Sequence, residues 1–273
     1  MSQYAVIGNP IAHSKSPLIH SLFAEQTAQD MSYGATRLEE GQLNGFIRDF
    51  FANGGGGLNV TLPYKEKAFA LASVCSPRAE LAKAVNTLFL DNQNQDCGDN
   101  TDGAGLVTDI KVNHGVQIQG RRVLIFGAGG AVRGALAALV DEHAAEITLV
   151  NRTLATAQQL QSEFENLANI EAMPAEQAIE SGCYDLLING TSLSLSGELP
   201  PVDVALLGQD CFCYDMMYSD TETVFTSWAK KHGAKLSADG LGMLVEQAAE
   251  SFAIWRGVCP DTAPVIERIR KSL

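Results

Sequence analysis

The fold is decided by one stretch, Arg121-Arg122-Val123-Leu124-Ile125-Phe126-Gly127-Ala128-Gly129-Gly130-Ala131. The apolar run over 123–126 predicts a strand over 121–126, the glycines over 127–130 predict a turn, and a helix is expected from residue 131 to about 141. A second strand over 147–150 completes a β-α-β unit. Backbone N–H groups at such a turn bind a pyrophosphate, and glycine lets the phosphate approach closely. The stretch therefore predicts a dinucleotide site formed by Gly127, Ala128, Gly129, Gly130 and Ala131; the alternative interpretation is a plain tight turn.

The residues after the second strand indicate which dinucleotide binds. NAD-binding folds place an acidic residue there for the ribose hydroxyls, whereas this chain has Asn151-Arg152-Thr153. A guanidinium binds a 2′-phosphate through two parallel hydrogen bonds, and a threonine hydroxyl adds a donor. The segment favours NADP over NAD; the alternative for Arg152 is a solvated surface arginine.

Predicted strands and helices alternate along the chain, which is typical of the α/β class. In the first half, strands are expected over 4–7, 58–60 and 85–90, with a helix capped by Ser16, a helix over 43–52 and a helix starting near Pro63. A polar loop over 91–97 and a segment over 98–103 precede a helix that runs to about residue 113. In the second half, strands are expected over 186–188, 212–214 and 234–236. This half is predicted to be doubly wound, and a helix over 241–255 is expected to return to the first domain.

Composition restricts the class of protein. The 273 residues suggest two domains, and 46% hydrophobic residues are ordinary for a globular protein. A formal net charge of −13 argues against nucleic acid or an anionic membrane surface as a partner. No secretory signal or membrane span is apparent, so a cytoplasmic location is expected. The six cysteines lack metal-ligand spacing, so no metal is expected, and Cys211 and Cys213 are interpreted as small buried hydrophobic residues.

Candidate catalytic residues lie where helices begin. Lys65 falls in the first turn of a predicted helix, which is the unfavourable end for a cation and invites a functional explanation. The alternative is an ordinary charged helix start, since Glu66 and Lys67 follow directly. Asp102 precedes another helix and either caps it or orients Lys65. Ser14 and Ser16 would share one side of an extended loop and suit a polyol or carboxylate, with helix capping by Ser16 as the alternative.

Four polar residues complete the candidate set. Asn59 and Thr61 alternate at the end of a predicted strand, so their side chains share one face. Asn86 ends another strand, and Gln247 lies on the last long helix; each amide offers a donor and an acceptor. Taken alone, Asn86 and Gln247 are more typical of structural or exposed positions.

Six segments, in chain order, resemble the motifs of the shikimate dehydrogenase family. They are Gly8-Asn9-Pro10-Ile11-Ala12-His13-Ser14-Lys15-Ser16-Pro17, Asn59-Val60-Thr61-Leu62-Pro63-Tyr64-Lys65, Gly98-Asp99-Asn100-Thr101-Asp102-Gly103, Gly127-Ala128-Gly129-Gly130-Ala131, Tyr214-Asp215-Met216-Met217-Tyr218 and Asp239-Gly240-Leu241-Gly242-Met243-Leu244-Val245. The resemblance covers essentially the whole chain. The GxGG loop departs from the usual GxGxxG spacing, but it is the form that this family uses.

The resemblance implies NADPH-dependent, reversible reduction of 3-dehydroshikimate to shikimate in the aromatic amino acid pathway. It implies an N-terminal α/β substrate domain over 1–102, completed by 239–273, an inserted Rossmann-type doubly wound NADP-binding domain over 103–238, and an active site between them. Lys65 and Asp102 are expected to be catalytic. The expected substrate-binding residues are Ser14, Ser16, Asn59, Thr61, Asn86, Asp102, Tyr218 and Gln247. The expected cofactor-binding residues are Gly127, Ala128, Gly129, Gly130, Ala131, Asn151, Arg152, Thr153, Met216 and Gly240.

The sequence is compatible with several alternatives. The family often has a second basic residue where this chain has Thr156, so the preference for NADP would rest on Arg152 alone. A quinate/shikimate dehydrogenase that accepts either cofactor is the nearest alternative. A non-catalytic ligand sensor on the same scaffold is another, although the presence of both Lys65 and Asp102 argues against it. A monomer or homodimer is expected.

Overall fold

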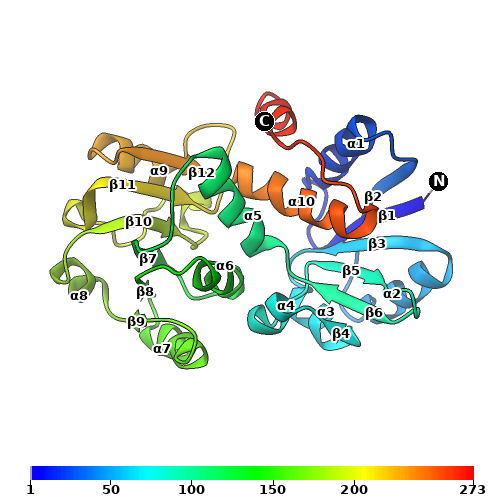
Figure 1. Cartoon of the computed structure of the whole chain (residues 1–273), viewed down its shortest axis with the longest axis horizontal. Helices are drawn as coiled ribbons and strands as arrows, with labels where there is room; N and C mark the ends of the chain where they lie inside the picture. The colour runs from blue at the N-terminus through cyan, green and yellow to red at the C-terminus, as the bar shows by residue number, and fades with distance from the viewer. Residues whose placement is uncertain (1) are drawn as a thin grey trace. The chain divides into compact units, whose positions relative to one another are not determined.

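The computed structural model describes residues 2–273, which divide into two compact units (Figure 1). The first unit contains the residues up to Gly105 together with Leu244–Ser272, and the second contains Leu106–Met243. Both changes from one unit to the other fall inside helices, namely α5 (Asp102–Thr108) and α10 (Leu241–Arg256). The chain therefore leaves the first unit and later returns to it.

The first unit contains a mixed six-stranded sheet in the order β2-β1-β3-β5-β6-β4. Its strands are β1 (Ser2–Gly8), β2 (Met31–Arg37), β3 (Gly55–Val60), β4 (Val74–Cys75), β5 (Thr87–Leu90) and β6 (Asp96–Asp99). Its other helices are α1 (Ser16–Gln26), α2 (Leu43–Ala52), α3 (Lys65–Leu71), α4 (Pro77–Ala82) and α11 (Ala263–Arg270). The core forms where Ile7, Leu58 and Val85 pack with the apolar side of α2.

The second unit contains a six-stranded sheet, parallel throughout, in the order β12-β11-β10-β7-β8-β9. Its strands are β7 (Arg122–Phe126), β8 (Glu146–Val150), β9 (Ile170–Ala172), β10 (Tyr184–Asn189), β11 (Leu207–Asp215) and β12 (Leu236–Asp239). Its helices are α6 (Gly130–Asp141), α7 (Leu154–Phe164), α8 (Ala175–Glu180) and α9 (Val224–Lys231), with a π-helix over Asp109–Asn113 and short 3₁₀ helices over Leu193–Ser196 and Val204–Leu206.

This strand order is that of the Rossmann fold, in which the first strand lies beside both the second and the fourth. β7 takes the central position because residues 123–126 are buried on both faces of the sheet, as expected for a parallel strand that helices cover. Cys211 and Cys213 of β11 are fully buried in the core of this unit, which confirms their interpretation as small buried hydrophobic residues. The α/β class with a Rossmann-type second half is confirmed.

Several local predictions were wrong. The expected loop over 91–97 ends in β6, which pairs antiparallel with β5, because cross-strand backbone hydrogen bonds outweigh the low strand propensity of Asp and Gly. Asn86 does not end a strand; it precedes β5. Ser16 does not cap α1 but is its first helical residue. The strand expected over 234–236 lies at Leu236–Asp239 instead.

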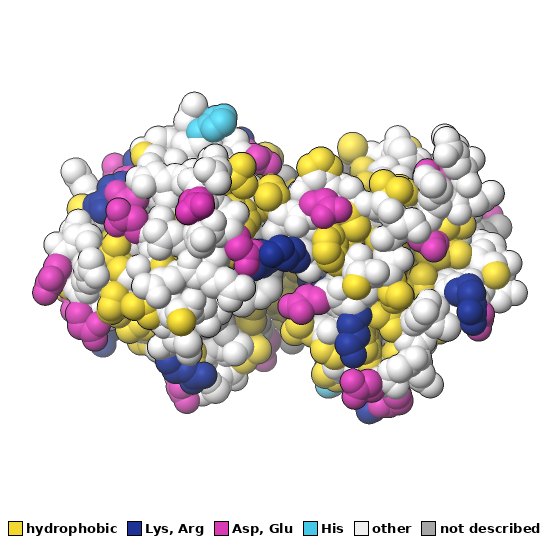
Figure 2. Space-filling view, turned by 90° about the horizontal axis from the view of Figure 1, so that it is seen from below, with side chains coloured by type: hydrophobic (Ala, Val, Ile, Leu, Met, Phe, Trp, Pro, Cys, Tyr) yellow, Lys and Arg dark blue, Asp and Glu magenta, His cyan; other side chains and the backbone are white. Residues whose placement is uncertain are grey.

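The surface agrees with the acidic composition. Acidic side chains, drawn in magenta, are scattered over the face shown in Figure 2, and the basic side chains on that face form no continuous stripe. The chain contains 32 acidic and 19 basic residues. Within residues 2–273, no helix has the length and apolar character needed to cross a bilayer.

Candidate active site

Lys65 and Asp102, two of the predicted site residues, form a close ion pair. Nζ of Lys65 lies 2.6 Å from Oδ2 of Asp102, and the side chains are 26% and 14% exposed. Lys65 is the first residue of α3 and Asp102 the first residue of α5, so both are held by helix starts. The carboxylate of Asp102 binds Lys65 rather than capping α5. The side chain of Lys65 is therefore only partly buried.

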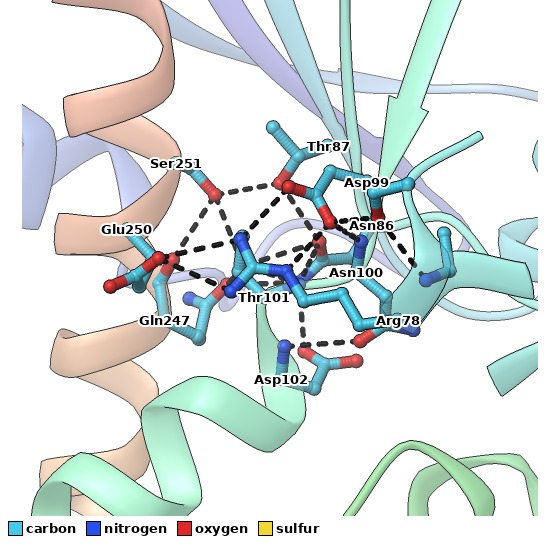
Figure 3. Close-up of polar contacts among 12 residues, drawn as sticks. Arg78, Asn86, Thr87, Asp99, Asn100, Thr101, Asp102, Gln247, Glu250 and Ser251 are labelled. Carbon is cyan, nitrogen blue, oxygen red and sulfur yellow. Dashed lines mark hydrogen bonds and ion pairs between the residues drawn. The ribbon is translucent and has the colours of Figure 1, made fainter. Parts of the chain in front are cut away.

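Asn86 holds the other oxygen of this carboxylate. Its Nδ2 donates to Oδ1 of Asp102 at 2.9 Å, while its Oδ1 accepts from the backbone N–H of Thr101 at 2.9 Å (Figure 3). Because a backbone N–H can only donate, this second bond sets which end of the amide is oxygen. The NH₂ group of Asn86 is therefore directed at Asp102.

Gln247 reaches the same cluster from α10. Its Oε1 accepts from Nδ2 of Asn86 at 3.3 Å, and its own Nε2 donates to the carbonyl of Leu244 at 2.8 Å. The cluster thus combines one cation, one carboxylate and two amides from four separate segments. Such a set can bind several hydroxyl groups and exchange a proton with one of them.

Asn59 lies behind this cluster. It is 6% exposed, and its Oδ1 accepts from the hydroxyl of Tyr33 at 2.6 Å. Its Nδ2 donates to the carbonyl of Asn86 at 3.1 Å and to Oγ of Ser251 at 3.0 Å. These bonds direct the amide into the protein, and substrate contact by Asn59 stays a prediction.

Ser14, Ser16 and Thr61 are not hydrogen-bonded to the Lys65 cluster. Oγ of Ser14 accepts from the backbone N–H of Ser16 at 3.3 Å, so Ser14 rather than Ser16 satisfies a donor at the start of α1. The two serines do not share one face of an extended loop, because Lys15 has helical backbone angles and Ser16 is buried. Thr61 follows β3, and within residues 2–273 its hydroxyl has no hydrogen-bond partner.

Sequence reasoning missed several residues of the network. Thr87 and Ser251 are fully buried, and their hydroxyl oxygens lie 2.7 Å apart. Oγ1 of Thr87 also donates to Oδ1 of Asn86 at 2.8 Å. Thr101 lies inside the motif over 98–103, and this is its only signal in the sequence. Thr87 and Ser251 have no such signal, because each is part of an ordinary strand or helix pattern.

The glycine loop of the second unit has the geometry expected for a phosphate site. Gly127 has a φ of +110°, a conformation that L side chains rarely adopt. Gly129 is the N-cap of the 12-residue helix α6 and supplies no side-chain cap, so the first N–H groups of α6 are available. A Cβ at Gly129 would meet nothing within 4 Å. The residues present fit a pyrophosphate bound through backbone N–H groups.

The segment after β8 contains polar side chains that are available to bind a ligand. Arg152 and Thr153 are exposed, and in the part of the chain that the structure describes Arg152 has no ion-pair partner. Thr153 is the N-cap of α7 but makes no side-chain capping bond. Nδ2 of Asn151 donates to the carbonyl of Thr153 at 2.9 Å, which shapes this turn. A guanidinium and a hydroxyl are therefore free to bind a phosphate.

Three further predicted residues belong to the second unit. Met216 directly follows β11 and is buried, and a Cβ at Gly240 would lie 2.3 Å from the carbonyl oxygen of Met216. This distance is too short for any residue larger than glycine at position 240. Burial raises the pKa of Tyr218, and the negative charge of Asp239 adds to this effect. No cluster of metal-binding side chains occurs among the described residues.

A Rossmann-type unit with an open glycine loop, in a chain that also carries a lysine–carboxylate pair among amides, defines a nicotinamide-dependent dehydrogenase class of protein. Family models narrow the class. Residues 6–88 match the shikimate dehydrogenase substrate binding domain, residues 109–194 match shikimate/quinate 5-dehydrogenase, and residues 240–270 match the shikimate 5′-dehydrogenase C-terminal domain. The chain belongs to the shikimate dehydrogenase family.

Individual relatives are similar over their full length. The chain is 52% identical to the NADP⁺-dependent shikimate dehydrogenase of Aeromonas salmonicida, with 100% of this chain and 99% of that protein covered. The crystal structure of an Ael1 enzyme from Pseudomonas putida matches with 42% identity, a TM-score of 0.93 and 98% coverage of each chain. The Thermus thermophilus shikimate 5-dehydrogenase, solved with NADP(H) and shikimate, matches with 33% identity, a TM-score of 0.88 and 100% coverage of each.

Proposed function

We propose that this chain catalyses the reversible, NADP-dependent interconversion of 3-dehydroshikimate and shikimate. The observation that carries the proposal is the contact of 2.6 Å between Nζ of Lys65 and Oδ2 of Asp102, inside a cluster of amides. This pair supplies a proton-transfer group that is fixed in place and partly open to solvent. Membership of the shikimate dehydrogenase family supports the choice of substrate.

The proposed cofactor site lies in the second unit. Gly127, Ala128, Gly129, Gly130 and Ala131 would hold the pyrophosphate, and Asn151, Arg152 and Thr153 would hold the adenosine ribose with its 2′-phosphate. Met216 and Gly240 would border the cofactor. When bound, NADPH supplies the hydride that reduces the carbonyl carbon. The domain assignment, 1–102 with 239–273 for substrate and 103–238 for NADP, is part of the proposal.

Lys65 is proposed to transfer the proton. During reduction its ammonium donates to the developing alkoxide oxygen, and during oxidation its amine accepts the hydroxyl proton. Asp102 holds Nζ through one carboxylate oxygen, while Asn86 binds the other, so the carboxylate has little freedom to rotate. Neutralising an alkoxide by a fixed cation is worth several kcal/mol in a site that excludes water.

The remaining polar groups are proposed to orient the ring. Asn86 and Gln247 carry amides beside the proton-transfer pair, and the free hydroxyl of Thr61 follows the neighbouring strand β3. Ser14 and Ser16 offer hydroxyls for the carboxylate of the substrate, with Asn59 and Tyr218 as further contacts. A monomer or homodimer and a cytoplasmic location remain predictions from the sequence.

The decisive experiment is an absorbance assay at the NADPH band. The purified chain is mixed with shikimate and NADP⁺, and formation of NADPH is followed. Rapid formation with shikimate and little with quinate is expected. Equal rates with both substrates would favour a quinate/shikimate dehydrogenase. Binding of NADPH, measured by fluorescence, without any turnover would refute the enzymatic proposal and favour a ligand sensor.

A further inference from the structure

A second charged group lies behind the Lys65–Asp102 pair in the first unit. Arg78 of α4 binds Asp99 at the end of β6 in a two-pronged ion pair, with Nε to Oδ1 at 2.7 Å and Nη2 to Oδ2 at 2.8 Å (Figure 3). Oε2 of Glu250, on α10, accepts from both Nη atoms of Arg78 at 3.3 Å. The guanidinium therefore joins three separate elements of this unit.

Asp99 is held by more than the arginine. Its carboxylate also accepts from the hydroxyl of Ser76 and from the backbone N–H of Asn100 at 2.7 Å. Burial by itself raises the pKa of Asp99, but the hydrogen bonds from Arg78 and Ser76 outweigh it and hold that pKa below its usual range. Asp99 is therefore an anion with fully engaged oxygens.

A series of hydrogen bonds runs from the carboxylate of Asp99 to the backbone of Asp102. The backbone N–H of Asn100 donates to Oδ1 of Asp99, and the N–H of Thr101 donates to Oδ1 of Asn86. The N–H of Asp102 donates to Oδ1 of Asn100 at 3.1 Å. Three successive backbone N–H groups are thus bound by side-chain oxygens. This segment cannot shift without breaking several of these bonds.

Asp99 also fixes the position of Asn86. Its carbonyl oxygen accepts from the backbone N–H of Asn86 at 3.0 Å, and Asn86 in turn binds the carboxylate of Asp102. The position of Asp99 therefore determines both the backbone that carries Asp102 and the side chain that holds it. Among the described residues, no side-chain hydrogen bond or ion pair joins Arg78 or Asp99 to Lys65.

We propose that Arg78 and Asp99 are positioning residues that hold Asp102, and through it Lys65, in the geometry for proton transfer. The inference rests on the proposed function of that pair. Removing the guanidinium leaves the Asp99 carboxylate with neutral donors only, so it turns toward water and releases the N–H of Asn100. A displacement of about 1 Å at a catalytic group costs about 100-fold in rate, and a partial displacement costs less.

The first test compares variants of two matched arginines. Arg78→Met is expected to lower kcat for shikimate oxidation by about 10-fold or more, with the KM for NADP⁺ unchanged. Arg78→Lys keeps the charge without the planar fork and is expected to recover part of the loss. Arg122→Met is the control, because Arg122 binds Glu146 in the second unit and has the same 33% side-chain exposure as Arg78. It is expected to lower the melting temperature and leave kcat unchanged.

The second test asks whether Arg78 acts through Asp102. In an Asp102→Asn background, Arg78→Met is expected to change kcat by less than about 2-fold, because the group it positions is already disabled. Independent, multiplying losses would overturn the proposal, as would a folded Arg78→Met variant with wild-type kcat. If Arg78→Met does not fold, Asp99→Asn decides the matter with the same expected loss of kcat. Absence of turnover in the wild-type chain would instead refute the proposed function.

Discussion

The backbone N–H of Thr101 donates to Oδ1 of Asn86 at 2.9 Å and thereby turns the NH₂ group of Asn86 toward the carboxylate of Asp102. The orientation of this amide is a consequence of hydrogen-bonding chemistry rather than of shape, because oxygen and nitrogen are nearly the same size. An aspartate at position 86 would fit the space and reverse the interaction. The cluster therefore depends on a donor at this position.

Asn86→Asp is accordingly expected to lower kcat/KM for shikimate by about 100-fold or more, since it replaces a donor with a second carboxylate beside Asp102. Steady-state kinetics with shikimate and NADP⁺ measure the change. Asn94→Asp, in an exposed loop, adds the same charge away from the cluster and controls for net charge. Retention of wild-type kcat/KM in Asn86→Asp would exclude the amide from the site.

Lys65→Ala is expected to lower the turnover of shikimate oxidation by two or more orders of magnitude, because the hydroxyl of shikimate then lacks its proton acceptor. Lys67→Ala is the matched control on the same helix: its side chain is 56% exposed, and among the described residues its only ion pair is with Glu40 at 3.5 Å. Turnover of both variants is measured at saturating shikimate. Near-normal turnover of Lys65→Ala would rule out this lysine as the acid/base.

Arg152→Ala is expected to raise the KM for NADPH while leaving the KM for NADH nearly unchanged, because only NADPH carries the 2′-phosphate. Thr156→Arg restores a second basic residue in the first turn of α7 and is expected to strengthen the preference for NADPH. Both are measured by initial rates with each cofactor. An equal rise in both KM values for Arg152→Ala would contradict a role in 2′-phosphate binding.

Substitutions at two glycines of the same loop test protein stability and cofactor binding separately. Gly127→Ala is expected to lower the free energy of unfolding by about 1–3 kcal/mol, because Gly127 has a φ of +110° and an added Cβ would lie 3.2 Å from the carbonyl oxygen of Gly190. Gly129→Ala meets no atom within 4 Å and is expected to leave stability unchanged but to raise the KM for NADP⁺. Urea denaturation and kinetics measure the two effects. Unchanged NADP⁺ kinetics in Gly129→Ala would place the phosphate elsewhere.

The sequence predicted the second unit more completely than the site. Local patterns sufficed for β7, the turn at Gly127 and α6, because each depends on neighbouring residues. Lys65 and Asp102 lie 37 positions apart, and nothing in their local sequence specifies the contact between them. The family resemblance named both residues, whereas Arg78 was not predicted at all, because its role depends on Asp99 and on Glu250, which is 172 positions away.

His20 has a buried imidazole that is expected to make the folded state sensitive to acid. It is fully buried, lies stacked on Tyr33 with ring centroids 4.1 Å apart, and among the described residues neither ring nitrogen has a hydrogen-bond partner. Burial lowers the pKa of His20 from 6.5 to about 3, because the charged form cannot be solvated there, and this effect outweighs the nearby side chain of Asn59, which favours the charged form. In the folded state the ring therefore stays neutral over this interval.

The unfolded chain takes up a proton at His20 as pH falls below 6.5, whereas the folded chain does so only near pH 3. The contribution is fully present above the unfolded pKa and is lost as pH falls, by up to about 1.4 kcal/mol per pH unit. His20→Phe removes this proton uptake, so the unfolding free energy of the variant is expected to depend less steeply on pH between 6.5 and 4.5. Urea denaturation across that range gives both slopes, and Phe23→Leu, at a fully buried neighbour that does not titrate, is expected to lower stability without changing the slope. Equal slopes for wild type and His20→Phe would show that His20 is protonated in the folded state or reaches solvent.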